Sequence, residues 1–153
     1  MLRALLWFAF VFDAAALKAG VLSKALKRKD GRPLVVHIWD PNPTQLESFA
    51  IDDVSEACRK AGASALLADP ALVGPLAKEQ EAQRGNFPGP LPVIADCPLK
   101  DLDAEVCTGA KNLGASGIGI RYHHGDYPED DALEGALKDA VTTAVAAGRM
   151  CSS

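Results

Sequence analysis

The chain has 153 residues, of which 48% are hydrophobic and 24% are charged, and its formal net charge is −4. This length and composition fit one globular domain with a buried core and exclude a wholly disordered chain. Residues 1–32 hold seven Lys or Arg against two Asp, whereas residues 33–153 hold nine against eighteen acidic residues. An acidic main body lacks the clustered cations that phosphates require, so nucleic acid is not expected as a partner.

Residues 1–29 are predicted to be an apolar N-terminal helix with a basic flank. A cation, an apolar run and small residues follow one another, as in a signal peptide. The apolar run is shorter than the roughly 20 residues that span a membrane. Its bulky side chains cover more than one helix face, which favours contact with a membrane surface or another subunit over cleaved targeting or a soluble cap. The predicted contact residues are Leu5, Trp7, Phe8, Phe10 and Phe12, with Lys24, Lys27 and Arg28 on the basic flank.

Residues 33–150 are predicted to form a second unit of four βα repeats. Four apolar runs, which begin at residues 33, 63, 89 and 116, are about 26 to 30 residues apart, the length of a strand with its crossover helix. The strands are expected within them near 34–39, 65–68, 91–95 and 117–122. Near-continuous apolar strands that alternate with helices indicate a parallel sheet covered by helices. The expected fold class is therefore α/β, a parallel-sheet half-barrel with its strands in sequential order.

The helices are expected at 44–61, 99–112 and 129–147, with a shorter helix after Asp69 that Gly74-Pro75 interrupts. Asp69 is expected to cap that shorter helix, and residues 80–90 are expected to be a loop. A half-barrel also leaves one apolar sheet face in water, with side chains such as Val35, Leu67 and Ile94 or their strand neighbours, unless something covers it. The expected cover is another protein, with residues 1–22 of the chain as the alternative.

Cys58 and Cys107 lie on the apolar faces of predicted helices, and the chain has no Cys-x-x-Cys pair. Both thiols are interpreted as small buried hydrophobes, with a disulfide or a metal site as the alternative.

Four segments together resemble the first half of indole-3-glycerol-phosphate synthase, over about residues 33–147. They are Leu34-Val-Val-His-Ile-Trp39, Ala61-Gly-Ala-Ser-Ala-Leu-Leu-Ala-Asp69, Leu91-Pro-Val-Ile-Ala-Asp96 and Leu113-Gly-Ala-Ser-Gly-Ile-Gly-Ile120. The resemblance implies half of a phosphate-binding (β/α)8 barrel, a fold that carries its active site at the carboxyl ends of the strands.

The catalytic residues that the resemblance implies are not retained. The family's Glu and Lys on the first strand fall on His37 and Trp39, and its Lys on the third strand falls on Asp96. A carboxyl group that is ionised near neutral pH cannot replace a lysine that donates a proton. We therefore expect no ring closure to an indole product.

Two classes of function are compatible with these residues. The first is a non-catalytic accessory subunit of a membrane-associated organellar complex, in a plastid thylakoid (a photosystem, for example) or a mitochondrial respiratory complex. Residues 1–29 would then contact other subunits or lipid, and no cofactor or metal is expected.

The alternative class is enzymatic: a divergent or truncated lyase of tryptophan biosynthesis, or an enzyme that uses polar residues at the strand ends. The candidate strand-end residues are Asp40, Asp69, Arg121 and His123, beside the degenerate positions His37 and Asp96. Open α/β sheets bind ligands at this edge, and carboxylates with a histidine can bind a divalent cation there.

Overall fold

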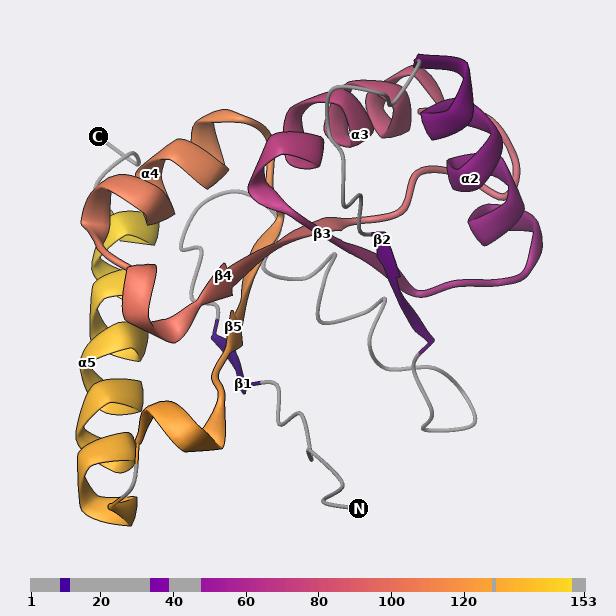
Figure 1. Cartoon of the computed structure of the whole chain (residues 1–153). Coiled ribbons are helices and arrows are strands. Elements are labelled where there is room, and N and C mark those ends of the chain that lie inside the picture. The colour runs from indigo at the N-terminus through magenta and orange to yellow at the C-terminus, as the bar shows by residue number, and fades with distance from the viewer. Residues whose placement is uncertain (1–8, 12–33, 39–47, 128, 150–153) are drawn as a thin grey trace, which may run out of the picture.

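The computed structural model describes residues 9–11, 34–38, 48–127 and 129–149, and these residues form an α/β fold around one five-stranded sheet (Figure 1). The strand order is β1-β5-β4-β3-β2. The strands are β1 (Ala9–Val11), β2 (Val35–Ile38), β3 (Ala65–Ala68), β4 (Val93–Pro98) and β5 (Gly117–Arg121). Strands β2 to β5 are parallel neighbours in chain order, which confirms the predicted succession of four βα units.

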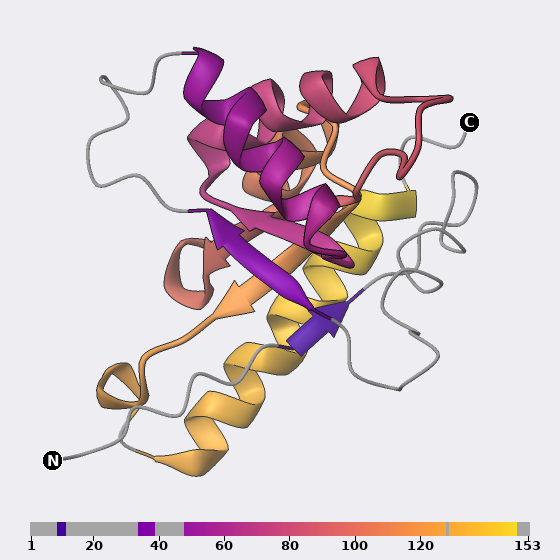
Figure 2. The ribbon, with the colours of Figure 1, turned by 90° about the vertical axis from the view of Figure 1, so that its right-hand side faces the viewer.

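A helix follows each of the four parallel strands. The helices are α2 (Ser48–Lys60), α3 (Pro70–Ala82), α4 (Ala104–Asn112) and α5 (Asp130–Arg149), with 3-10 turns at Leu99–Asp101 and His124–Asp126. Helices α2 and α3 pack together over one part of the sheet, and α4 and α5 pack together over the other (Figures 1 and 2).

The main core lies between the helices and one face of the sheet. Alternate strand residues, such as Leu66, Ala95 and Ile120, are fully buried there because successive side chains of a strand point to opposite faces. Cys58 and Cys107 are buried and free in this core, as predicted. The helical layer therefore covers this face of the sheet, as expected for apolar strands that alternate with helices.

The opposite face holds a second, smaller cluster made of Ala65, Leu67 and Ile94, with Val35 packed beside it. Leu67 and Ile94 were expected to meet water in the absence of a cover, but they are 2% and 0% exposed in the chain alone. Part of the reason is Gly119 on β5, since a Cβ there would stand 2.8 Å from Leu67 Cδ1. The missing side chain leaves room that Leu67 fills.

The predicted N-terminal helix is wrong for Ala9–Val11, which forms strand β1 and pairs antiparallel with β5. Phe10 is aligned with Gly119 in this register. Pairing satisfies backbone groups that the edge of β5 would otherwise leave open, which is the physical reason for a strand here. The remaining predicted contact residues lie outside the described residues: Leu5, Trp7, Phe8, Phe12, Lys24, Lys27 and Arg28. None of the helices that the structure describes is long and apolar enough to cross a membrane.

Two predicted helices have different bounds in the structure. Helix α3 continues through Pro75 to Ala82, because Leu72, Val73 and Leu76 are buried on both sides of the proline and hold the helix against the sheet. The helix expected over 99–112 is divided into a 3-10 turn and α4. Tertiary packing thus outweighs the local cost of proline in α3.

Two glycines allow a test of the backbone geometry. Gly114 follows α4 with φ +95°, and a Cβ there would lie 2.8 Å from Ala77 Cβ, whereas Gly135 lies inside α5 with open space around it. We expect Gly114→Ala to lower the free energy of unfolding by more than about 1 kcal/mol. We expect Gly135→Ala to raise it by about 0.5–1 kcal/mol, since alanine favours helix. Urea denaturation of both variants measures this, and effects of the same sign would contradict the described turn after α4.

Candidate functional site

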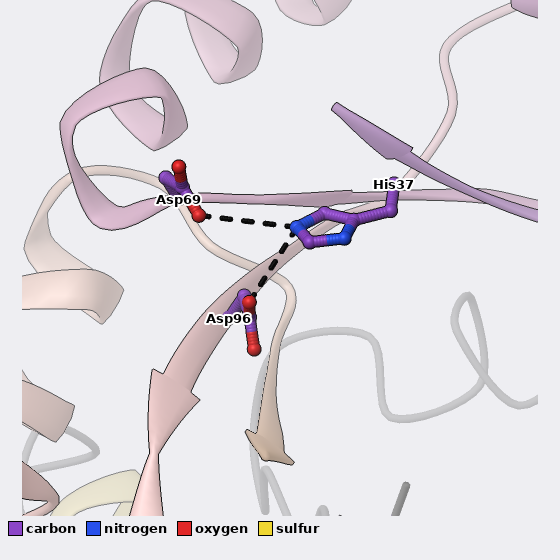
Figure 3. Close-up of side chains that lie close together, drawn as sticks. All are labelled: His37, Asp69 and Asp96. Atoms are coloured by element: carbon purple, nitrogen blue, oxygen red, sulfur yellow. Dashed lines mark ion pairs between the residues drawn. The ribbon is translucent and has the colours of Figure 1, made fainter. Parts of the chain in front are cut away.

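Three polar side chains meet at the carboxyl edge of the parallel sheet (Figure 3). His37 belongs to β2, Asp69 directly follows β3, and Asp96 belongs to β4. His37 Nε2 lies 3.8 Å from Asp69 Oδ1 and 3.4 Å from Asp96 Oδ2. Parallel strands in register bring their carboxyl ends to one edge, so residues about 30 positions apart in the chain become neighbours.

Asp96 is the innermost member of this cluster. Its side chain is 0% exposed, and Arg121 on β5 donates a hydrogen bond from Nε to Asp96 Oδ2 at 3.0 Å. The other carboxylate oxygen, Oδ1, is buried and has no hydrogen-bond partner among the described residues. A buried carboxylate with an unpaired oxygen is costly, so this atom indicates a partner beyond the described residues, for which a bound cation is one candidate.

Asp69 stands at the N-cap position of α3, but its side chain makes no capping hydrogen bond. The expected capping role is therefore wrong for its carboxylate. Asp103 provides a comparison within the same chain, because it caps α4 by accepting a hydrogen bond from Val106 N at 2.8 Å. The Asp69 carboxylate instead faces His37.

The cluster has the donor set and spacing of a metal centre. One imidazole nitrogen and two carboxylate oxygens lie within 4.8 Å of one another. An ion about 2.1 Å from each ligand atom separates neighbouring ligand atoms by about 3 to 4.2 Å, the range in which both measured contacts of His37 fall. The side chains of His37 and Asp69 are 39% and 25% exposed, so an ion can reach them from solvent.

The structure brings together four of the residues singled out from the sequence, although in different roles. His37 and Asp96 were interpreted as remnants of lost catalytic positions, yet they form the centre of the cluster with Asp69 and Arg121. His123 is exposed and lines a separate hollow that Arg121 also borders. Two further candidates, Asp40 and Trp39, lie outside the described residues.

Cys97 follows Asp96 on β4 and points to the opposite face of the sheet, into the main core. Burial, together with the neighbouring Cys107 and Asp96, raises the pKa of the Cys97 thiol to about 12, against a lowering by Arg121. A thiol that keeps its proton is neither a ready nucleophile nor a ready metal ligand. Cys97 therefore belongs to the core beneath the site.

Comparison with models of known protein families, with curated proteins and with solved structures gives no match for this chain. The resemblance to indole-3-glycerol-phosphate synthase stays a prediction from the residues, and the case for function depends on the geometry of the cluster.

The raised pKa of Cys97 predicts a specific alkaline destabilisation. An unfolded thiol loses its proton near pH 9, whereas the folded thiol keeps it to about pH 12, so rising pH in this window favours the unfolded state. Between pH 9 and pH 10, wild type should lose up to about 1.4 kcal/mol more unfolding free energy than Cys97→Ala. Urea denaturation at both pH values measures the difference. An identical pH dependence in the two proteins would place Cys97 in contact with water.

Proposed function

We propose that the chain binds one divalent metal ion through His37, Asp69 and Asp96, and that the ion acts as a Lewis acid toward a small-molecule ligand. The observation that carries the proposal is the fully buried carboxylate of Asp96: its Oδ2 lies 3.4 Å from His37 Nε2, and its Oδ1 has no hydrogen-bond partner among the described residues. The same carboxylate lies within reach of an imidazole and a second carboxylate.

The balance of charge supports a cation at this point. The cluster holds two carboxylates, of which Asp96 pairs with the guanidinium of Arg121, and a histidine that binds metal does so as neutral imidazole. The described cluster then carries a formal charge of about −1, and a divalent ion changes it to about +1. Because Asp96 is cut off from water, a cation at bonding distance offsets a desolvation cost of several kcal/mol.

The donor set favours particular ions. Carboxylate oxygens suit Mg²⁺ and Mn²⁺, whereas an imidazole nitrogen suits Zn²⁺ and Fe²⁺. A site with both donor types fits Mn²⁺, Fe²⁺ or Zn²⁺ better than Mg²⁺ or Ca²⁺, which prefer oxygen ligands alone.

Three protein ligands leave coordination positions for water or substrate, as in catalytic rather than structural metal sites. The partial exposure of His37 and Asp69 supports such an open site. A bound ion would polarise a carbonyl group or lower the pKa of a coordinated water molecule. The chain's own contribution is to hold three ligands on neighbouring strands of a rigid sheet.

The proposal predicts stoichiometric binding of Mn²⁺ or Zn²⁺ by the purified full chain, measured by isothermal titration calorimetry. His37→Gln, Asp69→Asn and Asp96→Asn should each weaken binding at least about tenfold, because each removes a ligand. Asp139→Asn is the matched control, since Asp139 is an exposed carboxylate on α5 away from the site. An ion at a concentration of 100 times Kd should stabilise wild type by about 2.7 kcal/mol.

Two results would overturn this proposal. One is an absence of binding by folded wild type at millimolar metal. The other is an equal affinity in Asp96→Asn and in Asp139→Asn, which would show that the ion binds to dispersed surface carboxylates.

The second candidate function is the non-catalytic accessory subunit of an organellar membrane complex, with residues 1–29 as its contact to protein or lipid. The observation that favours it is the position of β2 at the end of the sheet, where its outer edge has no partner among the described strands. Such an edge is suited to pairing with another chain. A metal site and an accessory role are compatible in one protein.

The accessory role is tested in the native cell by following the chain's migration with membranes and with large complexes on native gels. Deleting residues 1–22 is unsuitable because it also removes β1. The double variant Trp7→Ser, Phe12→Ser should shift the chain to the free fraction, because both changes remove apolar contact area. The control Glu105→Gln changes an exposed residue on α4 and should leave migration unchanged. A double variant that migrates as wild type does would refute the predicted role of residues 1–29.

A further inference from the structure

Arg121 connects the proposed metal centre to the solvent side of the site. Its side chain is 43% exposed, and its Nε is the atom that donates to Asp96 Oδ2 at 3.0 Å. A guanidinium carries five N–H donors in a planar fork, so this hydrogen bond uses only one of them. The two terminal amino groups donate no hydrogen bond to the described residues, which leaves them available to a ligand beside the carboxylate that would hold the ion.

We infer that the metal-loaded site binds a small carboxylate that chelates the ion, such as an α-hydroxy or α-keto acid, and that Arg121 pairs with its carboxylate group. The inference rests on the proposed metal binding and adds the chemical class of the ligand.

The number of protein ligands supports a chelating ligand. Three ligands on a six-coordinate ion leave three positions, and two oxygens on adjacent carbons of one molecule can fill two neighbouring positions. A planar guanidinium binds a carboxylate through two parallel hydrogen bonds, which fixes the orientation of the ligand as well as its charge. A neutral ligand can accept a hydrogen bond from Arg121 but lacks the charge pairing and the two parallel bonds of a carboxylate.

The charge of the site makes this binding depend on the metal. Without an ion, Asp69 and Asp96 outweigh Arg121, and an anion is repelled. With a divalent ion the formal charge becomes about +1, and an anion is attracted. The order of binding is therefore the ion first and the carboxylate second.

A hollow on the far side of Arg121 offers space for the rest of the ligand; it shares Arg121 with the cluster and is not lined by His37, Asp69 or Asp96. This open hollow of about 610 Å³ follows the ends of β4 and β5 and is bordered by Arg121, Lys100, His123 and Tyr127. Its volume falls in the range of about 300 to 1,000 Å³ that is usual for small-molecule sites. Asp101 and Asp126 also line this hollow, so its walls carry both signs of charge. Selection for an anion consequently depends on Arg121 and the ion.

The experiment titrates lactate and propionate into the full chain saturated with Mn²⁺, followed by calorimetry, with equilibrium dialysis to show that Mn²⁺ stays bound. Lactate should bind at least about tenfold more tightly than propionate, which lacks the second chelating oxygen. Arg121→Gln, measured at a Mn²⁺ concentration that saturates this variant, should weaken lactate binding at least about tenfold. Arg84→Gln is the matched control, because Arg84 is an exposed arginine that pairs with Glu81 in a different part of the chain.

The outcomes separate the two proposals. Failure of wild type to bind Mn²⁺ would overturn the metal site and this inference with it. Tight Mn²⁺ binding with equal lactate affinity in Arg121→Gln and Arg84→Gln would overturn the inference alone. Lactate binding to the metal-free chain at the same affinity would do so as well.

Loss of folding in Arg121→Gln is detected by thermal denaturation. In that event Arg121→Lys serves instead, because it keeps a positive charge near Asp96 but lacks the planar fork. Arg121→Lys should keep Mn²⁺ binding and lose part of the lactate affinity. An unchanged lactate affinity in Arg121→Lys would contradict recognition by a guanidinium.

Discussion

The buried negative charge of Asp96 is the constraint on which the rest of the site depends. A carboxylate removed from water costs several kcal/mol unless cations and hydrogen bonds surround it. Arg121 from β5 and His37 from β2 approach it from the two sides of β4. These contacts with Asp96 therefore require the observed register of the parallel pairs β2–β3, β3–β4 and β4–β5. The geometry of the site consequently depends on the stability of the sheet.

The apolar packing beneath the cluster strengthens the charge interactions that Asp96 makes. Leu67 and Ile94 fill the sheet face that carries Asp96, and Gly119 leaves them the room to do so. On the other face, Cys97 is buried in the main core and keeps its proton because burial raises its pKa. Asp96 thus lies between apolar layers, where charged interactions are weakly screened and an ion would be bound more strongly than at an open surface.

The strand order and most of the helices could be predicted from the sequence because local patterns determine them. Buried strands appear in the sequence as apolar runs, and the spacing of those runs matches the length of a βα unit. Helix α3 could not be delimited in this way, because Pro75 looks like a break until Leu72 and Leu76 are seen to anchor the helix. Strand β1 was not predicted either, since nothing within Ala9–Val11 records that the edge of β5 lies beside it.

The site was predicted only as a set of residues at one edge of the sheet. Asp69 followed by Pro70 looks like a helix cap, and the sequence cannot show that its carboxylate is turned toward His37. The comparison with indole-3-glycerol-phosphate synthase interpreted His37 and Asp96 as replacements of catalytic residues, because it compares each position with the residues of one reaction only. Strand register was the missing information: it places His37 beside Leu67 and Ala68 beside Ala95, and so brings the three side chains together.

The central claim is that the carboxyl edge of this half-barrel holds a metal ion between His37, Asp69 and Asp96. The most direct test is a crystal structure of the full chain grown with Mn²⁺, with anomalous diffraction measured at the manganese absorption edge. The account predicts one strong anomalous peak about 2.0 to 2.3 Å from His37 Nε2 and from one oxygen of each carboxylate. A well-ordered site with no peak there, or with a peak only at exposed surface carboxylates, would contradict it.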